Sequence, residues 1–162
     1  MITWTNLRQL LDYDPGTGWF TWLVNRGAAK KGARAGHRRA DGYRLIGVDG
    51  VLYLEHRLAF VYMTGREPDG EVDHANRDPA DNRWCNLREA TSSNNKANKS
   101  RPSNNTSGHK GVSWSKAVGK WHAYGSPGGG KRPHLGYFDG LEDAAAVAAA
   151  WRAEHHGHFA CV

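Results

Sequence analysis

Cysteine is scarce in this sequence, and long apolar runs are missing from it. Cys85 and Cys161 are the only cysteines among 162 residues, too few for a disulfide framework or for a zinc site of four cysteines. No apolar run approaches the roughly 20 residues that span a bilayer. The first residues show no basic stretch leading into an apolar one. We therefore expect a reduced, cytoplasmic protein with no membrane partner and no structural zinc.

Acidic residues are absent from one long segment. None occurs between Glu89 and Asp139, where lysines and arginines give a charge of +8, although the whole chain carries only +6. A second basic cluster lies between Arg26 and Arg44 and contains a single acid, Asp41. Such concentrated positive charge favours a polyanionic partner, while a solvated charged face is the alternative for each cluster.

The length and composition favour two small modules rather than one large core. The chain is 39% hydrophobic, and typical domains have about 100 to 150 residues. Residues 99–107 have the Ser, Asn and Pro content of a linker. We accordingly place a first domain at 1–98 and a second domain at 108–162.

In the first domain, apolar and turn residues predict helices and hairpins. A short helix capped by Thr5 is followed by a strand at 19–24 and by a basic, glycine-rich loop at 26–39 that we expect to be mobile. The Asp-Gly pair at 49–50 accepts the positive φ of a tight turn, which predicts a hairpin. A helix over 55–64, ended by a glycine, comes next.

Shorter elements follow. Strands are predicted at Val72 and at 87–90, with a long polar loop between them and a helix from about Ser92. In the second domain, three alternating segments predict antiparallel strands, and the alanine-rich run 141–155 predicts a helix. A stripe of alanines lets that helix lie close against the sheet, so the other face of the sheet would be free.

Four side chains between 73 and 95 combine the groups that metal-assisted hydrolysis of a phosphodiester needs. Asp73 offers a carboxylate oxygen and Asn95 an amide oxygen, which are ligands suited to a single Mg²⁺ or Mn²⁺ ion. Histidine titrates near neutral pH, so His74 is suited to take a proton from water. Asn86 has an amide suited to tethering the loop that carries His74.

The adjacency of Asp73 and His74 places a condition on the local structure. Neighbouring residues of an ideal strand point to opposite faces, so both side chains can serve one site only where the strand ends or twists. We therefore predict that the strand ends at this pair.

A wider pattern surrounds these residues. HRLAF at 56–60 is followed by VDHANRD at 72–78, DNRWCNLREAT at 81–91 and SNN at 93–95. This pattern resembles the HNH endonuclease family, specifically its phage and homing-type branch. The resemblance implies a ββα-metal fold with a core at about 52–98. For a phage protein, the expected location is the host cytoplasm.

The resemblance also implies roles for individual residues. Asp73 and Asn95 would bind one divalent ion per active site, His74 would activate water, and Asn86 would be the structural middle residue of the motif, with Asn82 bracing the loop. Some relatives carry two CxxC zinc knuckles that this sequence lacks. Packing must then stabilise the fold, through Val72, Trp84, Leu87 and the preceding helix.

Lysine and aromatic residues are interleaved in the second domain, which is typical of nucleic-acid-binding surfaces because phosphates attract cations and rings contact bases and sugars. GHKGVSWSKAVGKWHAYG at 108–125, KRPHLGYFDGLEDAAAVAAAW at 131–151 and HGHFA at 156–160 resemble the DNA-binding domain of plant ethylene-response factors, the Apetala type. The resemblance implies a sheet that reads the major groove. Lys116, His122 and Tyr124 replace expected arginines, and lysine lacks the fork that reads guanine, so we expect a loose sequence preference.

The residues expected to contact DNA come from both domains. They are Arg57, Lys96, Lys110, Trp114, Lys116, Lys120, Trp121, Lys131 and Arg132. Three of these interpretations have alternatives. Trp114 or Trp121 could instead belong to the core under the helix, and Arg57 could pair with an acid instead of a phosphate. For His56, the alternatives are a packed side chain and a place near the active site.

These observations predict an α+β protein, with a ββα-metal nuclease domain followed by a small three-stranded antiparallel sheet packed on one helix. We expect a metal-dependent DNA endonuclease of the homing type that hydrolyses phosphodiester bonds and is targeted by its C-terminal module. The expected partner is double-stranded DNA, with a phage packaging or replication protein as a further candidate, and the expected state is a monomer or weak dimer. The alternative is a non-catalytic DNA-binding regulator, and action on RNA is a weaker one.

Overall fold

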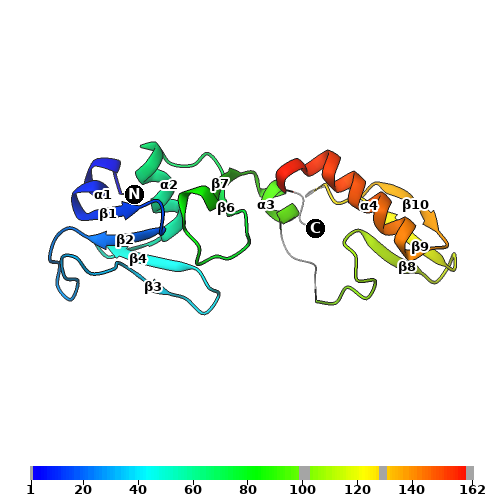
Figure 1. The fold of residues 1–162 in the computed structure, drawn as a ribbon, viewed down its shortest axis with the longest axis horizontal. Coiled ribbons are helices and arrows are strands. Elements are labelled where there is room, and N and C mark those ends of the chain that lie inside the picture. Colours follow the sequence, from blue (N-terminus) through cyan, green and yellow to red (C-terminus); the bar gives the residue numbers. More distant parts are fainter. Residues whose placement is uncertain (1, 99–102, 128–130, 160–162) are drawn as a thin grey trace. The chain divides into compact units, whose positions relative to one another are not determined.

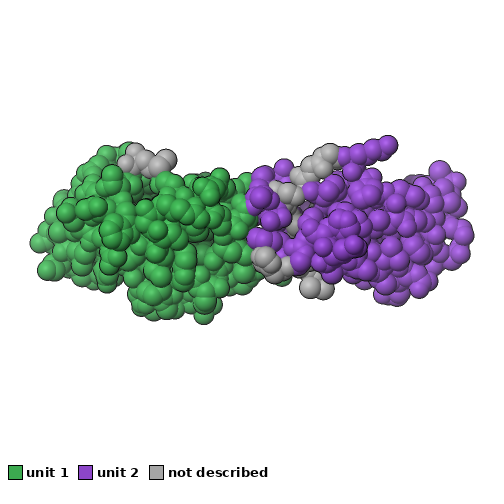
Figure 2. Space-filling model, turned by 90° about the horizontal axis from the view of Figure 1, so that it is seen from above, with its two compact units in different colours: residues 1–90 green, residues 91–162 purple. Residues whose placement is uncertain are grey.

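The computed structural model describes residues 2–98, 103–127 and 131–159 and divides the chain into two compact units, residues 1–90 and 91–162 (Figures 1 and 2). Each unit combines helices with antiparallel strands, so the predicted α+β class is confirmed. The division falls after Ala90, whereas the sequence placed the end of the first domain at 98. Part of the predicted linker, 99–102, lies outside the described residues. Within the described ranges, no helix is long and apolar enough to cross a membrane.

Unit 1 begins with a helix and a hairpin. α1 (Trp4–Leu10) is capped by Thr3, whose hydroxyl accepts a 3.2 Å hydrogen bond from the backbone N–H of Asn6. The prediction of Thr5 as the cap was wrong, because Thr5 already lies in the first helical turn. β1 (Leu11–Asp14) and β2 (Trp19–Trp22) then pair antiparallel.

A three-stranded sheet with strand order β3-β4-β5 follows. β4 (Arg44–Val48) and β5 (Val51–Leu54) form the predicted hairpin, with φ of 51° at Asp49 and 77° at Gly50 in its turn. β3 (His37–Arg38) pairs with β4 and lies inside the segment 26–39 that the sequence assigned to a loop. That segment is held to β2, since Gly32 and Ala35 donate backbone hydrogen bonds to the carbonyls of Trp22 and Phe20.

α2 (Glu55–Thr64) connects this sheet to the motif. It ends at Gly65, which has φ of 75°, as the sequence predicted. Its residues Leu58, Ala59 and Val61 are buried in a core that also receives side chains from α1, β1, β2 and β4. The helix is therefore fixed to the N-terminal elements before the motif begins.

Two short strands carry the motif. β6 (Glu71–His74) and β7 (Leu87–Ala90) pair antiparallel, and the 3₁₀ turn η1 (Trp84–Asn86) precedes β7. Val72 and Leu87 are buried in the core of unit 1, and Trp84 packs against it. These are the packing contacts that the sequence analysis expected in place of zinc knuckles. α3 (Ser92–Asn98) follows in unit 2.

Unit 2 contains the predicted sheet and helix. β8 (Val112–Ser115), β9 (Lys120–Tyr124) and β10 (His134–Phe138) form an antiparallel sheet of order β10-β9-β8. α4 (Leu141–His156) packs on one face, with its buried alanines against Val112 and Ala123, and the turn η2 (Gly157–Phe159) follows it. The prediction of a three-stranded sheet packed on one helix is confirmed.

A buried ion pair joins the sheet of unit 1 to α2. Glu55 is fully buried, and its carboxylate accepts a 2.6 Å hydrogen bond from Nε of Arg44. Arg44 also donates to the carbonyl oxygens of Ala35 and Gly36. Burial raises the pKa of Glu55, and the charge of Arg44 opposes that rise. The ionised carboxylate therefore depends on Arg44.

Replacing Arg44 by Ala should lower the free energy of unfolding by about 3–5 kcal/mol, because the charge of Glu55 would stay buried without its partner. Urea unfolding followed by circular dichroism measures this loss. The control is Arg39→Ala, which removes an exposed ion pair with Asp41 at 2.9 Å and should cost less than about 1 kcal/mol. Equal losses for the two variants would contradict this account of the buried pair.

Candidate active site

Asp73 and His74 lie at the end of β6, as the motif required. The strand ends at His74, and a turn follows in which the backbone N–H of Arg77 donates to the carbonyl of His74 at 2.9 Å. The two side chains are only 6% and 4% exposed. Both residues are therefore held in well-packed surroundings at the point where the chain leaves the strand.

The imidazole of His74 has a buried partner. Nε2 of His74 lies 2.9 Å from Oδ1 of Asn82, and Asn82 is 1% exposed. With the amide oxygen as acceptor, Nε2 carries the proton and Nδ1 carries the lone pair. This contact selects one tautomer and one orientation of the ring.

The β1–β2 hairpin holds Asn82 in place. The hydroxyl of Tyr13 donates a 2.7 Å hydrogen bond to the carbonyl of Asn82, and the backbone N–H of Trp84 donates to the carbonyl of Pro15 at 3.0 Å. Gly18, with φ of 74°, approaches so closely that a Cβ there would lie 2.3 Å from the carbonyl carbon of Asn82. An N-terminal hairpin thus positions the partner of His74.

Asn86 tethers the loop between β6 and β7. Its Oδ1 accepts a 2.9 Å hydrogen bond from the backbone N–H of Asn76, and its Nδ2 donates to Oδ1 of Asn76 and to the carbonyl of Asp81. Arg83 also binds the carboxylate of Asp81 and lowers its pKa to about 2. These bonds close the loop on itself beside His74.

Asp73 has a cationic partner that the sequence analysis missed. Oδ2 of Asp73 accepts hydrogen bonds from Nε and Nη2 of Arg88, at 2.9 Å and 2.8 Å. Arg88 lies opposite Asp73 in the β6–β7 register. The pairing of the two predicted strands could have revealed it, because residues directly opposite each other on an antiparallel pair are neighbours.

Two further rings surround His74. The imidazole of His56 packs edge to face against His74, with ring centroids 4.9 Å apart, and the ring of Tyr43 lies 5.4 Å from His56 and 6.0 Å from His74. His56 is 5% exposed, and burial, followed by the proximity of His74, lowers its pKa to about 3. His56 is therefore a neutral, packed neighbour of the site, and Tyr43 is a neighbour that the sequence analysis did not identify.

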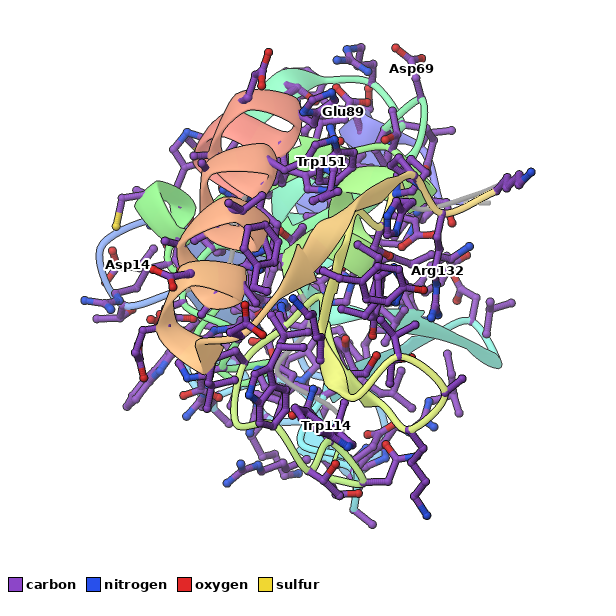
Figure 3. All side chains as sticks on the ribbon, turned by 90° about the vertical axis from the view of Figure 1, so that its right-hand side faces the viewer. Asp14, Asp69, Glu89, Trp114, Arg132 and Trp151 are labelled. Carbon is purple, nitrogen blue, oxygen red and sulfur yellow. The ribbon has the colours of Figure 1, made fainter. Side chains whose placement is uncertain are left out.

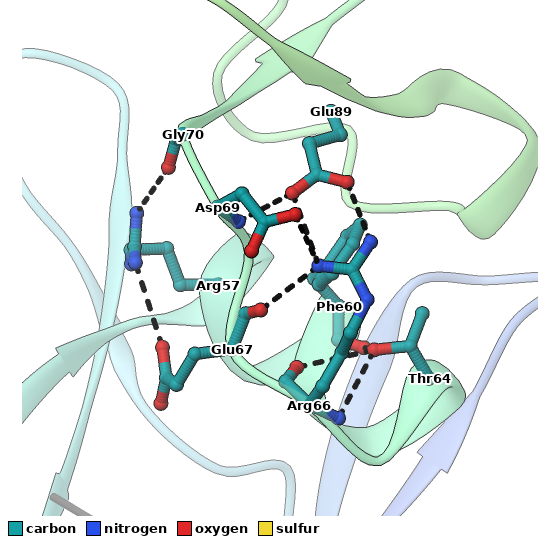
Figure 4. Close-up of polar contacts among 8 residues, drawn as sticks. All are labelled: Arg57, Phe60, Thr64, Arg66, Glu67, Asp69, Gly70 and Glu89. Atoms are coloured by element: carbon teal, nitrogen blue, oxygen red, sulfur yellow. Dashed lines mark hydrogen bonds and ion pairs between the residues drawn. The ribbon is translucent and has the colours of Figure 1, made fainter.

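Arg57 makes its contacts within unit 1. Nη1 donates to the carbonyl of Gly70 at 3.2 Å, and Nη2 lies 3.4 Å from the carboxylate of Glu67 (Figure 4). In the same network, Arg66 binds the carboxylate of Glu89. Arg57 thus braces the segment before β6. This arrangement agrees with the alternative that Arg57 pairs with an acid, and a contact between Arg57 and DNA stays a prediction.

Asn95 and Lys96 lie on α3, in unit 2. The backbone N–H of Asn95 donates to the carbonyl of Thr91 at 2.9 Å, and Lys96 is exposed. The joint binding of a metal by Asp73 and Asn95 stays a prediction.

The donor chemistry of Asp73 and Asn95 fits a hard divalent cation, which prefers carboxylate and amide oxygens. Among the described residues, no group of three or more His, Cys, Asp and Glu side chains is arranged for a metal ion. A site with few protein ligands, completed by water and phosphate, is what magnesium commonly uses.

The sheet of unit 2 has one face that α4 does not cover. Alternation along β9 places Lys120, His122 and Tyr124 on this open face, because Ala123 points into the core. Nδ1 of His134 lies 2.9 Å from Nε2 of His122, and the guanidinium of Arg132 lies 5.2 Å from the ring centroid of Tyr124. Figure 3 shows Arg132 on the side of the sheet away from α4. The open face therefore combines cations with rings.

The other predicted cations lie around the sheet. Lys116 is exposed in the turn between β8 and β9, and Lys131 is exposed before β10. Lys120 pairs with Asp139 at 3.1 Å. The carbonyl of Lys110 accepts a hydrogen bond from Arg152 of α4.

The two predicted tryptophans lie on the side of α4. Trp114 and Trp121 are opposite each other in the β8–β9 register, with ring centroids 5.1 Å apart. Trp121 packs against the core of unit 2, whereas Trp114 is 47% exposed. Trp121 therefore takes the core position that was the alternative for either tryptophan, whereas Trp114 is accessible at the surface.

Comparison with known proteins identifies the central region. Residues 53–97 match the model of a family described as HNH endonuclease, a family of phosphodiester hydrolases that act on DNA and generally use a divalent metal. No curated protein and no solved structure matches the chain. The resemblance of the C-terminal module to ethylene-response factors stays a prediction.

The buried His56 should make the fold sensitive to acid. Its pKa of about 3 lies below the ordinary value of 6.5, so the unfolded chain binds the proton more tightly and stability is lost as the pH falls below about 6.5. Between pH 7 and pH 4.5, wild type should lose about 2 kcal/mol more than His56→Phe, since one pKa unit corresponds to about 1.4 kcal/mol. Urea unfolding at the two pH values measures this. Replacing the exposed His37 by Phe is the control, and this variant should show the same pH dependence of stability as wild type. Equal acid sensitivity in His56→Phe and wild type would contradict the lowered pKa of His56.

Proposed function

Because residues 53–97 form an HNH endonuclease domain, we propose that this protein hydrolyses phosphodiester bonds of double-stranded DNA with His74 as the general base. The metal is a single Mg²⁺ or Mn²⁺ ion, and the C-terminal module binds the DNA that is cut. The homing type of HNH enzyme is the branch whose sequence pattern this chain resembles.

His74 takes the proton from the attacking water. The hydrogen bond between Nε2 and Asn82 supports Nδ1 as the nitrogen that accepts this proton, because a neutral imidazole has one donor and one acceptor nitrogen. As the proton leaves, the water oxygen forms a bond to phosphorus and the bond from phosphorus to the leaving oxygen breaks. The fixed orientation of the ring lowers the cost of reaching this geometry.

Asp73 and Asn95 are the residues that would hold the cation. When bound, a divalent ion neutralises charge on the scissile phosphate and on the leaving oxygen. Arg88 orients the carboxylate of Asp73 through two hydrogen bonds, which is the usual role of residues that surround a metal ligand. Asn86 keeps the loop after His74 closed through its bonds to Asn76 and Asp81.

The C-terminal module raises the local concentration of DNA at the nuclease domain. Its open face carries Lys120, His122, Tyr124 and Arg132, which suit phosphates and bases. Two modules joined in one chain bind a single DNA molecule more tightly than either module alone. Lys120, unlike Arg132, lacks the guanidinium fork that reads guanine, so this module would bind many sequences.

The observation that carries the proposal is the contact of His74 with the buried Asn82. This contact supports the proposal because a general base needs a fixed ring orientation and a defined tautomer. The rival function, a non-catalytic DNA-binding regulator, is favoured by a different observation, the bonds from Arg88 to the carboxylate of Asp73. A guanidinium in that place could substitute for a metal and preserve the fold without cleavage.

Cleavage of supercoiled plasmid separates these functions. Wild type with Mg²⁺ or Mn²⁺ should give nicked or linear product, and a chelator should abolish it. His74→Ala should slow cleavage by about 100- to 10,000-fold, the usual contribution of a general base, with DNA affinity nearly unchanged in a gel-shift assay.

The control for this variant is His37→Ala, which removes an exposed imidazole from unit 1 and should leave cleavage unchanged. Intact plasmid under all metal conditions would favour the regulator. Full cleavage by His74→Ala would exclude His74 as the base.

A further inference from the structure

The tip of the β3–β4 hairpin lies against the candidate active site, although it precedes the family match by about ten residues. A tight turn forms this tip, in which the N–H of Arg39 donates to the carbonyl of Tyr43 at 2.7 Å and the N–H of Gly42 donates to the carbonyl of Arg39 at 3.1 Å. The turn brings the half-buried ring of Tyr43 against His74 and His56. One wall of the site therefore comes from this hairpin.

The tip also touches the loop that follows His74. Gly42 has φ of 91°, and a Cβ there would lie 2.7 Å from Cγ of Pro79 and 3.8 Å from Nη2 of Arg38. Any side chain at 42 would collide with Pro79. The guanidinium of Arg38 therefore lies near the contact between the hairpin tip and the β6–β7 loop.

Arg38 differs from the other arginines of the hairpin. Arg39 pairs with Asp41 at 2.9 Å, and Arg44 pairs with the buried Glu55. Arg38 is exposed and, among the described residues, has no acidic partner. An unneutralised guanidinium on the hairpin that brings Tyr43 against His74 is suited to a phosphate oxygen.

Polar atoms in the same cluster lack partners. The hydroxyl of Tyr43 makes no hydrogen bond to the described residues and is not one of the buried unpaired atoms, so it is accessible to a ligand. Nδ1 of His56, in a side chain 95% buried, also has none. Nδ2 of Asn82, which neighbours His74, is likewise buried without a partner. Two buried unpaired atoms beside His74 indicate that a polar ligand or water completes this region.

We propose that the tip of the β3–β4 hairpin is a phosphate-binding wall of the active site, where the guanidinium of Arg38 and the hydroxyl of Tyr43 contact the backbone of the DNA strand that is cut. This inference rests on the proposed nuclease function. It gives the second basic cluster of the chain a specific role and adds a binding surface outside the matched family region.

The hydroxyl is tested by Tyr43→Phe, which keeps the ring that packs on His56 and His74. Loss of one hydrogen bond to the phosphate should slow single-turnover plasmid cleavage about three- to tenfold. A purely structural role for the ring would leave the rate of this variant at the wild-type value. Circular dichroism confirms that the variant is folded.

The guanidinium is tested by DNA binding in the His74→Ala background, where cleavage is expected to be at least about 100-fold slower than in wild type. Adding Arg38→Ala should weaken the binding of a 30-base-pair duplex about three- to tenfold and should reduce the slope of log affinity against log salt by about 0.9, the value for one phosphate contact. Arg38→Lys should recover part of the affinity. Arg39→Ala removes the same charge from the same hairpin and should change neither quantity, because Asp41 already neutralises it.

The outcomes separate this inference from the proposed function. A smaller salt slope in the Arg38 variant alone supports the phosphate-binding wall even if wild type fails to cut DNA. Equal affinities for the Arg38 and Arg39 variants, together with wild-type cleavage by Tyr43→Phe, would overturn it while leaving the nuclease intact.

Discussion

The hydrogen bond between His74 and Asn82 is the contact on which the rest of the site depends. With the amide oxygen of Asn82 as acceptor, it selects the tautomer in which Nδ1 carries the lone pair, and it is buried, so water does not compete with it. Asn82 is fixed in turn by Tyr13, and its segment by the carbonyl of Pro15. The β1–β2 hairpin, far away in the sequence, thus positions the partner of His74, and it packs in the same core as α1 and α2.

The same logic divides the polar residues of the motif into two groups. Asp73 and His74 are proposed to act on the substrate, while Arg88, Asn82 and Asn86 restrict how those two side chains can move. A polar cluster this well buried is stable only when its groups are satisfied by one another. Nδ1 of His56 and Nδ2 of Asn82, which are buried beside His74 without partners, therefore indicate where a polar group of the substrate or a water belongs.

Much of the fold could be predicted from the sequence because the signals are local. The Asp-Gly turn at 49–50, the glycine that ends α2 and the alanine stripe of α4 each determine a short piece of backbone. The residues that were missed depend on contacts over long distances in the sequence. β3 needed its partner β4, Tyr43 reaches His74 across 31 residues, and the cap of α1 was misassigned by two residues because Thr3 and Thr5 are equally good candidates by type. For Trp121, strand register decides which face it occupies, and residue type does not.

The central claim is that Asn82 orients His74 for catalysis. Single-turnover cleavage of plasmid by Asn82→Ala, at saturating metal and protein, tests it most directly. The account predicts a rate roughly 100-fold below wild type, with unchanged DNA affinity and a folded circular dichroism spectrum. A folded Asn82→Ala variant that cuts as fast as wild type would contradict it.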